Sequence, residues 1–340
     1  MKIGILTGGG DCPGLNAAIR AVVRKGMREY GMEFVGIRDG WKGMLEADGF
    51  PIGADDVSGL LVKGGTILGS SRTNPLKMQD GILKVNEGFR KLGLDALIAI
   101  GGDDTLSVAA GMSREGLKVI GIPKTIDNDL LGTERTIGFA TAFNTVVDAI
   151  DKLHTTAESH HRVMILEVMG RHAGWIATLS GIAGGADLVL IPEKPFDLDE
   201  ICRIIKKRHE RKRFTIVVVA EGAVPKGGRV TTKSGELDDF GHVALGGVAN
   251  WLKKEIQART GFETRSSILG HIQRGGTPCA EDRLLATRFG AKAIYLASMN
   301  TFGVMVALRN NKIEYISLDE AVKDREVDEE WYSLAETFFG

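Results

Sequence analysis

The chain has 340 residues, of which 43% are hydrophobic and 26% are charged, and its formal net charge is −1. This composition is typical of a soluble globular protein with a sizeable core, and it excludes a global basic field that would attract nucleic acid or an anionic membrane. Three scattered cysteines without a CxxC pair indicate neither a zinc site nor a disulfide framework, and they favour a cytoplasmic location.

Short β-branched runs alternate with helical patterns along the chain. The expected strands are Lys2–Thr7, Glu33–Ile37, Ala96–Ile100, Lys118–Ile122, Arg162–Val168, Asp187–Ile191, Phe214–Ala220, Ser266–Leu269 and Val304–Leu308. The expected helices include Leu15–Tyr30, Gly138–Thr156, Leu198–Lys212, Val243–Thr260 and Glu281–Ala297. Because several strands are continuous apolar runs, the pattern predicts an α/β fold with doubly wound, largely parallel sheets. Ligands in such folds bind beyond the carboxyl ends of the strands.

The first expected strand runs into TGGGDCPGLNAAIR, residues 7–20. Three consecutive glycines, Gly8 to Gly10, let backbone N–H groups approach an anion, and the next helix offers the positive end of its dipole. An ordinary strand–helix turn is the alternative for this segment alone. Pro13 replaces the third glycine of a dinucleotide-binding fingerprint and no Gly-Lys-Ser/Thr follows, so neither that motif nor a P-loop is indicated.

Two further strand-end loops are rich in carboxylates: GGDDT at residues 101–105 and PKTIDND at residues 123–129. Their acids are Asp103, Asp104, Asp127 and Asp129. These loops would crowd four negative charges unless a metal ion or cationic ligands offset them. A solvated turn explains any one of the three loops far better than it explains all three together.

Five arginines stand beside glycine-rich loops or apolar strands. They are Arg72, Arg162, Arg171, Arg265 and Arg274. A lone arginine is more often a surface charge, but guanidinium groups bind phosphate oxygens in a bidentate manner, and five of them favour a phosphorylated substrate. His271, in the Gly-His-x-x-Arg turn, is suited to donate to a sugar phosphate, whereas Met169 is equally well explained by core packing.

The motifs GGGDCPGLNAAIR, GGDDT, PKTIDND, EVMGR and LGHIQRGG, in this order, resemble the 6-phosphofructokinase family from the first strand to about residue 310. A GGD turn alone also occurs in NAD kinases and lipid kinases, but the ordered set is specific. The resemblance implies two α/β lobes with the site between them. Residues 1–138 and 273–323 would form the phosphoryl-donor lobe, and residues 139–272 and 324–340 the fructose 6-phosphate lobe.

The resemblance also implies roles on the donor side. Asp127 would take the proton from the sugar 1-hydroxyl, with Thr125 and Asp129 in support. Asp103 would bind Mg²⁺, the expected cofactor. The donor would be held by Gly9, Gly10, Arg72, Gly102 and Lys124. Transfer itself would involve Asp127, Arg171, Lys124 and Asp104.

On the sugar side, the resemblance implies one set of residues from the same chain and one from a neighbour. The first set is Met169, Gly170, Arg171, Glu221, His271 and Arg274. Arg162 and Arg265 would arrive from the neighbouring subunit of a homo-oligomer, either a dimer or a tetramer.

Asp104 bears on the choice of donor. ATP-using members of the family typically have glycine there, since the backbone passes close to the nucleotide α-phosphate. A carboxylate about 4 Å from that phosphate would cost roughly 4 kcal/mol at an effective dielectric near 20. Lysine at the position of Lys124 is typical of the pyrophosphate-dependent branch, which this sequence resembles there, although some ATP-using relatives also have it. The sequence therefore predicts phosphoryl transfer from pyrophosphate to fructose 6-phosphate, with an ATP-dependent 6-phosphofructokinase as the alternative.

Two departures from the allosteric bacterial members bear on regulation. A long segment rich in Gly, Thr and charge, residues 221–245, separates motifs that lie closer together in those enzymes. His154 replaces an arginine that they use in effector binding. Both differences predict an enzyme without an allosteric effector site. The resemblance to the pyrophosphate-dependent branch implies a reaction that lies nearer equilibrium than ATP-dependent transfer, and therefore a reversible one. A catalytically dead sensor is disfavoured, because Asp103 and Asp127 are both present.

Overall fold

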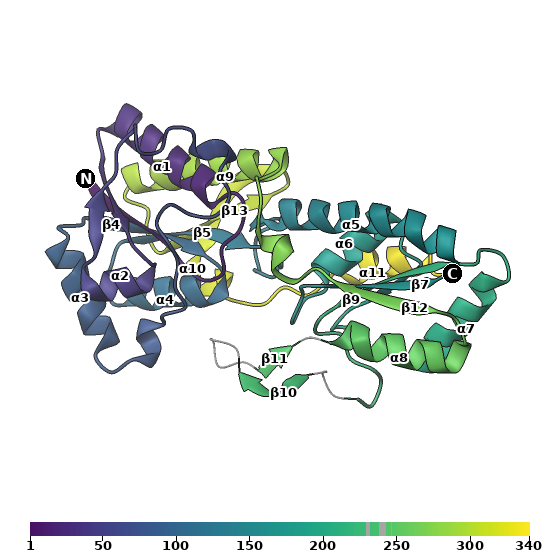
Figure 1. Ribbon diagram of the computed structural model, residues 1–340. Helices are drawn as coiled ribbons and strands as arrows, with labels where there is room; N and C mark the ends of the chain where they lie inside the picture. Colours follow the sequence, from purple (N-terminus) through teal and green to yellow (C-terminus); the bar gives the residue numbers. More distant parts are fainter. Residues whose placement is uncertain (229–231, 238–242, 246) are drawn as a thin grey trace. The chain divides into compact units, whose positions relative to one another are not determined.

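The computed structural model describes residues 1–228, 232–237, 243–245 and 247–340 (Figure 1). The chain divides into two compact units. Unit 1 comprises Met1–Thr141 and Arg274–Asp324, and unit 2 comprises Ala142–Gln273 and Arg325–Gly340. None of the helices in these described ranges is both long enough and apolar enough to cross a membrane.

Unit 1 is built on an eight-stranded sheet in the order β14-β13-β5-β4-β1-β2-β3, with β6 beside β5. The strands are β1 Lys2–Thr7, β2 Glu33–Ile37, β3 Gly49–Pro51, β4 Ala96–Gly101, β5 Val119–Thr125, β6 Ile137–Gly138, β13 Val304–Arg309 and β14 Lys312–Ser317. The central strands pair in parallel, and only the edge strands β3 and β14 run antiparallel. Every residue of β4 and β5 is buried, which explains the apolar sequence of β4 and of β5 up to Pro123.

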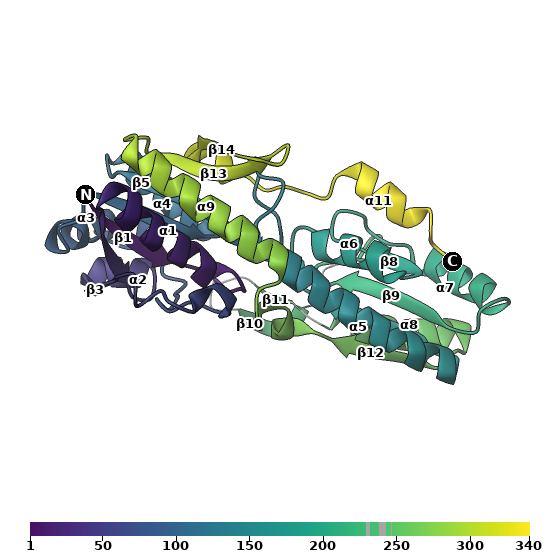
Figure 2. The ribbon, with the colours of Figure 1, turned by 90° about the horizontal axis from the view of Figure 1, so that it is seen from above.

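The helices of unit 1 cover this sheet. They are α1 Leu15–Tyr30, α2 Trp41–Glu46, α3 Gly81–Lys91, α4 Asp103–Arg114, α9 Ala280–Ser298 and α10 Leu318–Ala321. Helix α1 packs along α9, although the two are far apart in the sequence (Figure 2). Gly31 ends α1 in the left-handed conformation, at φ 58°, which glycine adopts without a Cβ penalty. Helix α5, Phe139–His160, begins in unit 1 and continues into unit 2.

Unit 2 contains a four-stranded parallel sheet in the order β12-β7-β9-β8. The strands are β7 Val163–Val168, β8 Leu188–Leu190, β9 Thr215–Ala220 and β12 Thr264–Ile268, and the helices are α6 Trp175–Gly184, α7 Leu198–His209, α8 Val248–Thr260 and α11 Glu329–Glu336. Leu252 and Ile256 of α8 share a buried core with Val217 and Val219 of β9. A separate antiparallel pair is formed by β10 Thr232–Leu237 and β11 Val243–Leu245.

The predicted α/β fold class is confirmed, and several predicted boundaries are corrected. The helix expected at Val243–Thr260 is wrong at its start, because residues 243–245 form β11 and the helix begins at Val248 after Gly247, whose φ is 96°. The strand expected at Ser266–Leu269 begins two residues earlier and includes Arg265. Asp103 and Asp104 are not loop residues but the first residues of α4. In the segment predicted as a surface excursion, residues 229–231 and 238–242 lie outside the described residues.

Candidate active site

Three loops of unit 1 meet at the carboxyl edge of its sheet, because β5, β4 and β1 are adjacent and parallel. The N–H of Gly8, just after β1, donates to the carbonyl of Ile100 in β4 at 3.0 Å. The Thr105 side chain fills the space between the loops: a Cβ on Gly8 would lie 2.5 Å from its Oγ1, and one on Gly101 would lie 2.3 Å from its Cβ. Close packing therefore requires glycine at both positions, and Thr105 is a contributor that sequence reasoning missed.

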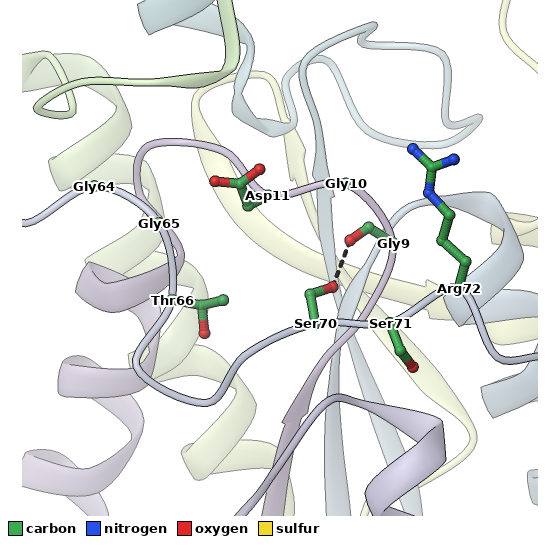
Figure 3. A pocket seen from close by; sticks show the side chains of 9 residues that line it. All are labelled: Gly9, Gly10, Asp11, Gly64, Gly65, Thr66, Ser70, Ser71 and Arg72. Atoms are coloured by element: carbon green, nitrogen blue, oxygen red, sulfur yellow. Dashed lines mark hydrogen bonds between the residues drawn. The ribbon is translucent and has the colours of Figure 1, made fainter. Parts of the chain in front are cut away.

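The predicted donor residues Gly9, Gly10 and Arg72 line a single cavity of about 560 Å³ (Figure 3). The other lining residues are Asp11, Gly64, Gly65, Thr66, Ser70 and Ser71. The N–H of Gly9 donates to the carbonyl of Ser71 at 3.1 Å, and the Ser70 hydroxyl donates to the Gly9 carbonyl. Sequence reasoning missed residues 64–71 because they follow no strand, although their glycine and serine content was a usable signal.

Lys124 contacts the same glycine loop through its buried side chain. Its side chain is only 2% exposed, and Nζ donates to the Gly10 carbonyl at 2.5 Å. Burial lowers the pKa of this ammonium, and the charge of Arg274 lowers it further. Arg274 lies against the loop as well, since its Nη1 donates to the Asp11 carbonyl at 3.4 Å. The structure thus places Arg274 with the donor loop of unit 1, whereas Met169 to Arg171, Glu221 and His271 belong to unit 2.

The predicted base, Asp127, is oriented by Thr125. The Asp127 N–H donates to Thr125 Oγ1 at 3.1 Å, and that hydroxyl lies 3.5 Å from Asp127 Oδ2. Asp129 follows in the same loop, and burial, together with the charge of Asp127, raises its pKa to about 7. Asp324 also raises this pKa, and the bridge between Leu130 and Asp324 brings it beside the loop. Asp324 comes from the far end of the chain, so no local motif marks it.

Asp103 begins α4, and its carboxylate accepts from Ser107 Oγ at 3.2 Å. Loss of solvation raises the pKa of Asp103, and the charges of Asp104 and Asp324 raise it further. Within the described part of the chain, no three His, Cys, Asp or Glu side chains form a metal cage. Mg²⁺ does not need one, since it binds one or two carboxylates and completes its shell with water and phosphate oxygens. Because a cation would relieve the excess negative charge at this edge, the residues present fit Mg²⁺.

Asp129→Asn should change how stability depends on pH. The folded pKa is about 7 against an ordinary value of 3.8, so between these values the folded chain holds a proton that the unfolded chain releases. The free energy of unfolding of the native sequence should therefore fall as pH rises through this window, and the variant should lack that fall. We expect the Tm of the variant, relative to the native protein, to rise by a few degrees between pH 5 and pH 8 without metal. A Tm difference that is constant with pH would contradict the shift.

Unit 2 places most of its predicted residues beyond the carboxyl ends of its strands. Met169, Gly170 and Arg171 follow β7, Glu221 follows β9, and His271 follows β12. The loops are joined by backbone hydrogen bonds: the Glu221 N–H donates to Val168 O at 2.9 Å, and the Gly222 N–H donates to Gly170 O at 3.1 Å.

Gln273 is fully buried, and its Oε1 accepts from the Met169 N–H at 3.2 Å. It lies inside the LGHIQRGG motif, where sequence reasoning assigned roles only to His271 and Arg274.

Arg162 and Arg265 lie at the opposite end of this sheet. Arg162 directly precedes β7, and Arg265 is the second residue of β12, which is parallel to β7. At about 3.3 Å per residue, the length of β7 separates Arg162 from Met169 by roughly 20 Å. One chain therefore does not bring the two arginines together with the other predicted sugar-binding residues. Both arginines instead form ion pairs with Glu263.

Known proteins resemble this chain over its full length. The phosphofructokinase family profile matches residues 2–297. The chain is 55% identical, over 100% of both sequences, to an Amycolatopsis methanolica protein named pyrophosphate–fructose 6-phosphate 1-phosphotransferase. It is 51% identical, over 99% of both, to a Streptomyces coelicolor protein named ATP-dependent 6-phosphofructokinase 3.

Solved structures agree with these matches. The Pichia pastoris phosphofructokinase in the T-state aligns with a TM-score of 0.86 and 33% identity, over 99% of this chain and 39% of that chain. A pyrophosphate-dependent phosphofructokinase from Nitrosospira multiformis shares the fold, with a TM-score of 0.85 at 21% identity over 100% of this chain and 92% of that one. The order of motifs, the strand-end loops and these matches together establish that the chain belongs to the phosphofructokinase family.

Proposed function

We propose that this protein transfers a phosphoryl group from pyrophosphate to the 1-hydroxyl of fructose 6-phosphate, giving fructose 1,6-bisphosphate and phosphate. The proposal rests on the three strand ends of unit 1, where a glycine loop, a buried lysine and several carboxylates meet. Phosphoryl transfer needs positioning, charge neutralisation and an oriented hydroxyl rather than a covalent intermediate. Relatives of that name at 55% and 54% identity over the full length support it.

The donor would bind in the cavity lined by Gly9, Gly10 and Arg72. Lys124 would hold the loop in place and add positive charge beneath the phosphates. Gly102 precedes α4, so the free N–H groups of that helix would face the donor. A magnesium ion, when bound, would neutralise charge on the transferred group, and Asp103 would hold it. Asp127, oriented by Thr125, would accept the proton of the 1-hydroxyl.

Unit 2 would bind the sugar phosphate through Met169, Gly170, Arg171, Glu221 and His271. Because Arg162 and Arg265 lie a strand length away, they would serve the site of a second copy of the chain. We therefore propose a homo-oligomer with shared sites. Its three cysteines are free, which fits a cytoplasmic enzyme.

We propose that no effector controls this activity. His154 stands where the allosteric members are expected to have an effector-binding arginine. Its Nε2 is hydrogen bonded to the Gly184 carbonyl at 2.9 Å, and its ring meets the Phe214 ring edge-on at 5.9 Å between centroids. The side chain is thus engaged in packing within unit 2 rather than offered to an anion.

The choice of donor rests on Asp104. ATP-dependent relatives are nearly as similar to this chain as the pyrophosphate-dependent ones, at 51% against 55% identity, so overall similarity alone does not decide. Asp104 is exposed in the first turn of α4, immediately after the residue proposed to hold the metal. A carboxylate there repels any further phosphate, which ATP has and pyrophosphate lacks.

The test is an assay of the purified protein with fructose 6-phosphate and Mg²⁺, and with either pyrophosphate or ATP as the sole donor. We expect fructose 1,6-bisphosphate with pyrophosphate and little or none with ATP. Preference for ATP would overturn the donor while leaving the sugar reaction in place. Absence of product with both donors would overturn the function.

Asp104→Gly should allow ATP to serve as a measurable donor. It removes a repulsion of a few kcal/mol beside the α-phosphate, so kcat/KM for ATP should rise by about tenfold or more. Pyrophosphate use should stay level or fall. Asp104→Asn, which removes the charge but keeps the bulk, separates the electrostatic from the steric effect. If Asp104→Gly folds and keeps its pyrophosphate activity but gains none with ATP, donor choice lies elsewhere.

A further inference from the structure

One carboxylate of unit 2, that of Glu263, binds two arginines at once. Its Oε1 lies 2.9 Å from Arg162 Nη2 and also accepts from Arg265 Nη2. These are the two arginines that we propose bind the sugar phosphate in the site of a second chain. Nothing in the sequence pattern singled out Glu263.

Strand register explains why the three side chains converge. Thr264 pairs with Val163 across the parallel β12–β7 ladder, and the Val163 N–H donates to the Glu263 carbonyl at 3.0 Å. Glu263 is therefore level with Arg162 on the neighbouring strand. Arg265 is two residues further along and returns to the same face as Glu263. The backbone thus holds one carboxylate between two guanidinium groups.

After pairing with Glu263, the two arginines keep a net positive charge and further N–H groups, which suit a phosphate. Glu263 offsets one of the two positive charges, and the nearby Arg162, followed by Arg265, lowers the pKa of its carboxyl. Each guanidinium has five N–H groups, of which Glu263 engages one. Among the residues that the structure describes, Arg162 Nε has no hydrogen-bond partner although it is buried, and an unsatisfied buried donor is costly.

We propose that Glu263 is a positioning residue that holds Arg162 and Arg265 together, ready to bind the phosphate of the sugar. This inference rests on the proposed function. Arginine side chains are long and lose rotamer freedom when a ligand fixes them. Ion pairs with Glu263, here called the clamp, order both side chains in advance and so reduce the entropy cost of binding. The clamp adds little to folding, because the side chains of Arg265 and Glu263 are 47% and 43% exposed and surface ion pairs contribute little stability.

Glu263→Gln is the direct test, since it keeps the shape and removes the charge. We expect KM for fructose 6-phosphate to rise about three- to tenfold, with kcat, KM for pyrophosphate and Tm nearly unchanged. The matched control is Glu200→Gln, which removes the carboxylate partner of Arg203 on α7 and should change none of these values. An unchanged KM in Glu263→Gln, or a KM change that accompanies a fall in Tm as in general destabilisation, would overturn the role.

A double-mutant cycle shows whether Glu263 acts through the arginines. In an Arg265→Ala background, Glu263→Gln should raise the Kd for fructose 6-phosphate, measured calorimetrically without donor, by much less than in the native background. Equal effects in both backgrounds would refute positioning. Native protein that binds fructose 6-phosphate while Glu263→Gln binds it equally well would refute this inference alone. Native protein that neither binds nor converts fructose 6-phosphate would refute the proposed function and this inference with it.

Discussion

Asp127→Asn is expected to lower kcat by about 10²-fold or more, within the range for loss of a general base, with little change in affinity for fructose 6-phosphate. The amide cannot accept the proton of the 1-hydroxyl, yet it keeps the size of the carboxylate. Because the Asp127 N–H donates to Thr125 Oγ1 through the backbone, that bond survives the substitution.

The measurement is steady-state kinetics with pyrophosphate as donor, together with calorimetric binding of the sugar phosphate. Asp148→Asn, a change at an exposed acid paired with Lys152 on α5, is the control and should leave kcat intact. A near-normal kcat in Asp127→Asn would remove the proposed base.

Arg162→Ala and Arg265→Ala are each expected to leave a nearly inactive enzyme, because a fully engaged phosphate-binding arginine is costly to lose. The more informative result comes from mixing subunits. Both arginines lie at the same end of one chain, so a hybrid of the two arginine variants has no site with both arginines. Mixing these two proteins should therefore restore nothing.

A different mixture should restore activity. In a hybrid of Asp127→Asn and Arg265→Ala subunits, one of two sites combines an intact base with intact arginines from the neighbour. After random pairwise exchange, activity should approach about a quarter of the native value. If hybrids form, as shown by mass, and activity stays absent, the sites are not shared in this way. Recovery from the two arginine variants would also contradict the shared arrangement.

Local signals were enough to predict part of the fold. The boundaries of β1, α1 and β2 match the predicted ones, since an apolar run followed by glycine punctuation is contained in a few neighbouring residues. Residues 243–245 were assigned to the wrong element because a short apolar run fits a strand as well as a helix. The acids Asp103 and Asp104 were assigned to a loop, although acids are also typical of the first turn of a helix.

The site was predictable where one motif carries it, as at Gly9 and Gly10. It was not predictable where distant segments meet. Asp324 affects the pKa of Asp129 only because the chain returns to that loop at its far end. Gln273 binds Met169, more than a hundred residues away, and one of the two partners of Glu263, Arg162, is about a hundred residues away. Such pairs depend on strand order and register, which no local pattern in the sequence specifies.

The division of unit 1 into two segments has a consequence for biosynthesis. Helix α1 packs on α9, and β5 pairs with β13, yet α9 and β13 are made only after all of Ala142–Gln273. As the chain leaves the ribosome, its first 141 residues therefore lack the partners that cover them. Most of unit 2, Ala142–Gln273, is synthesised before the second segment of unit 1, Arg274–Asp324. The nascent chain consequently exposes an unfinished apolar face for much of its synthesis, which is the state that chaperones recognise.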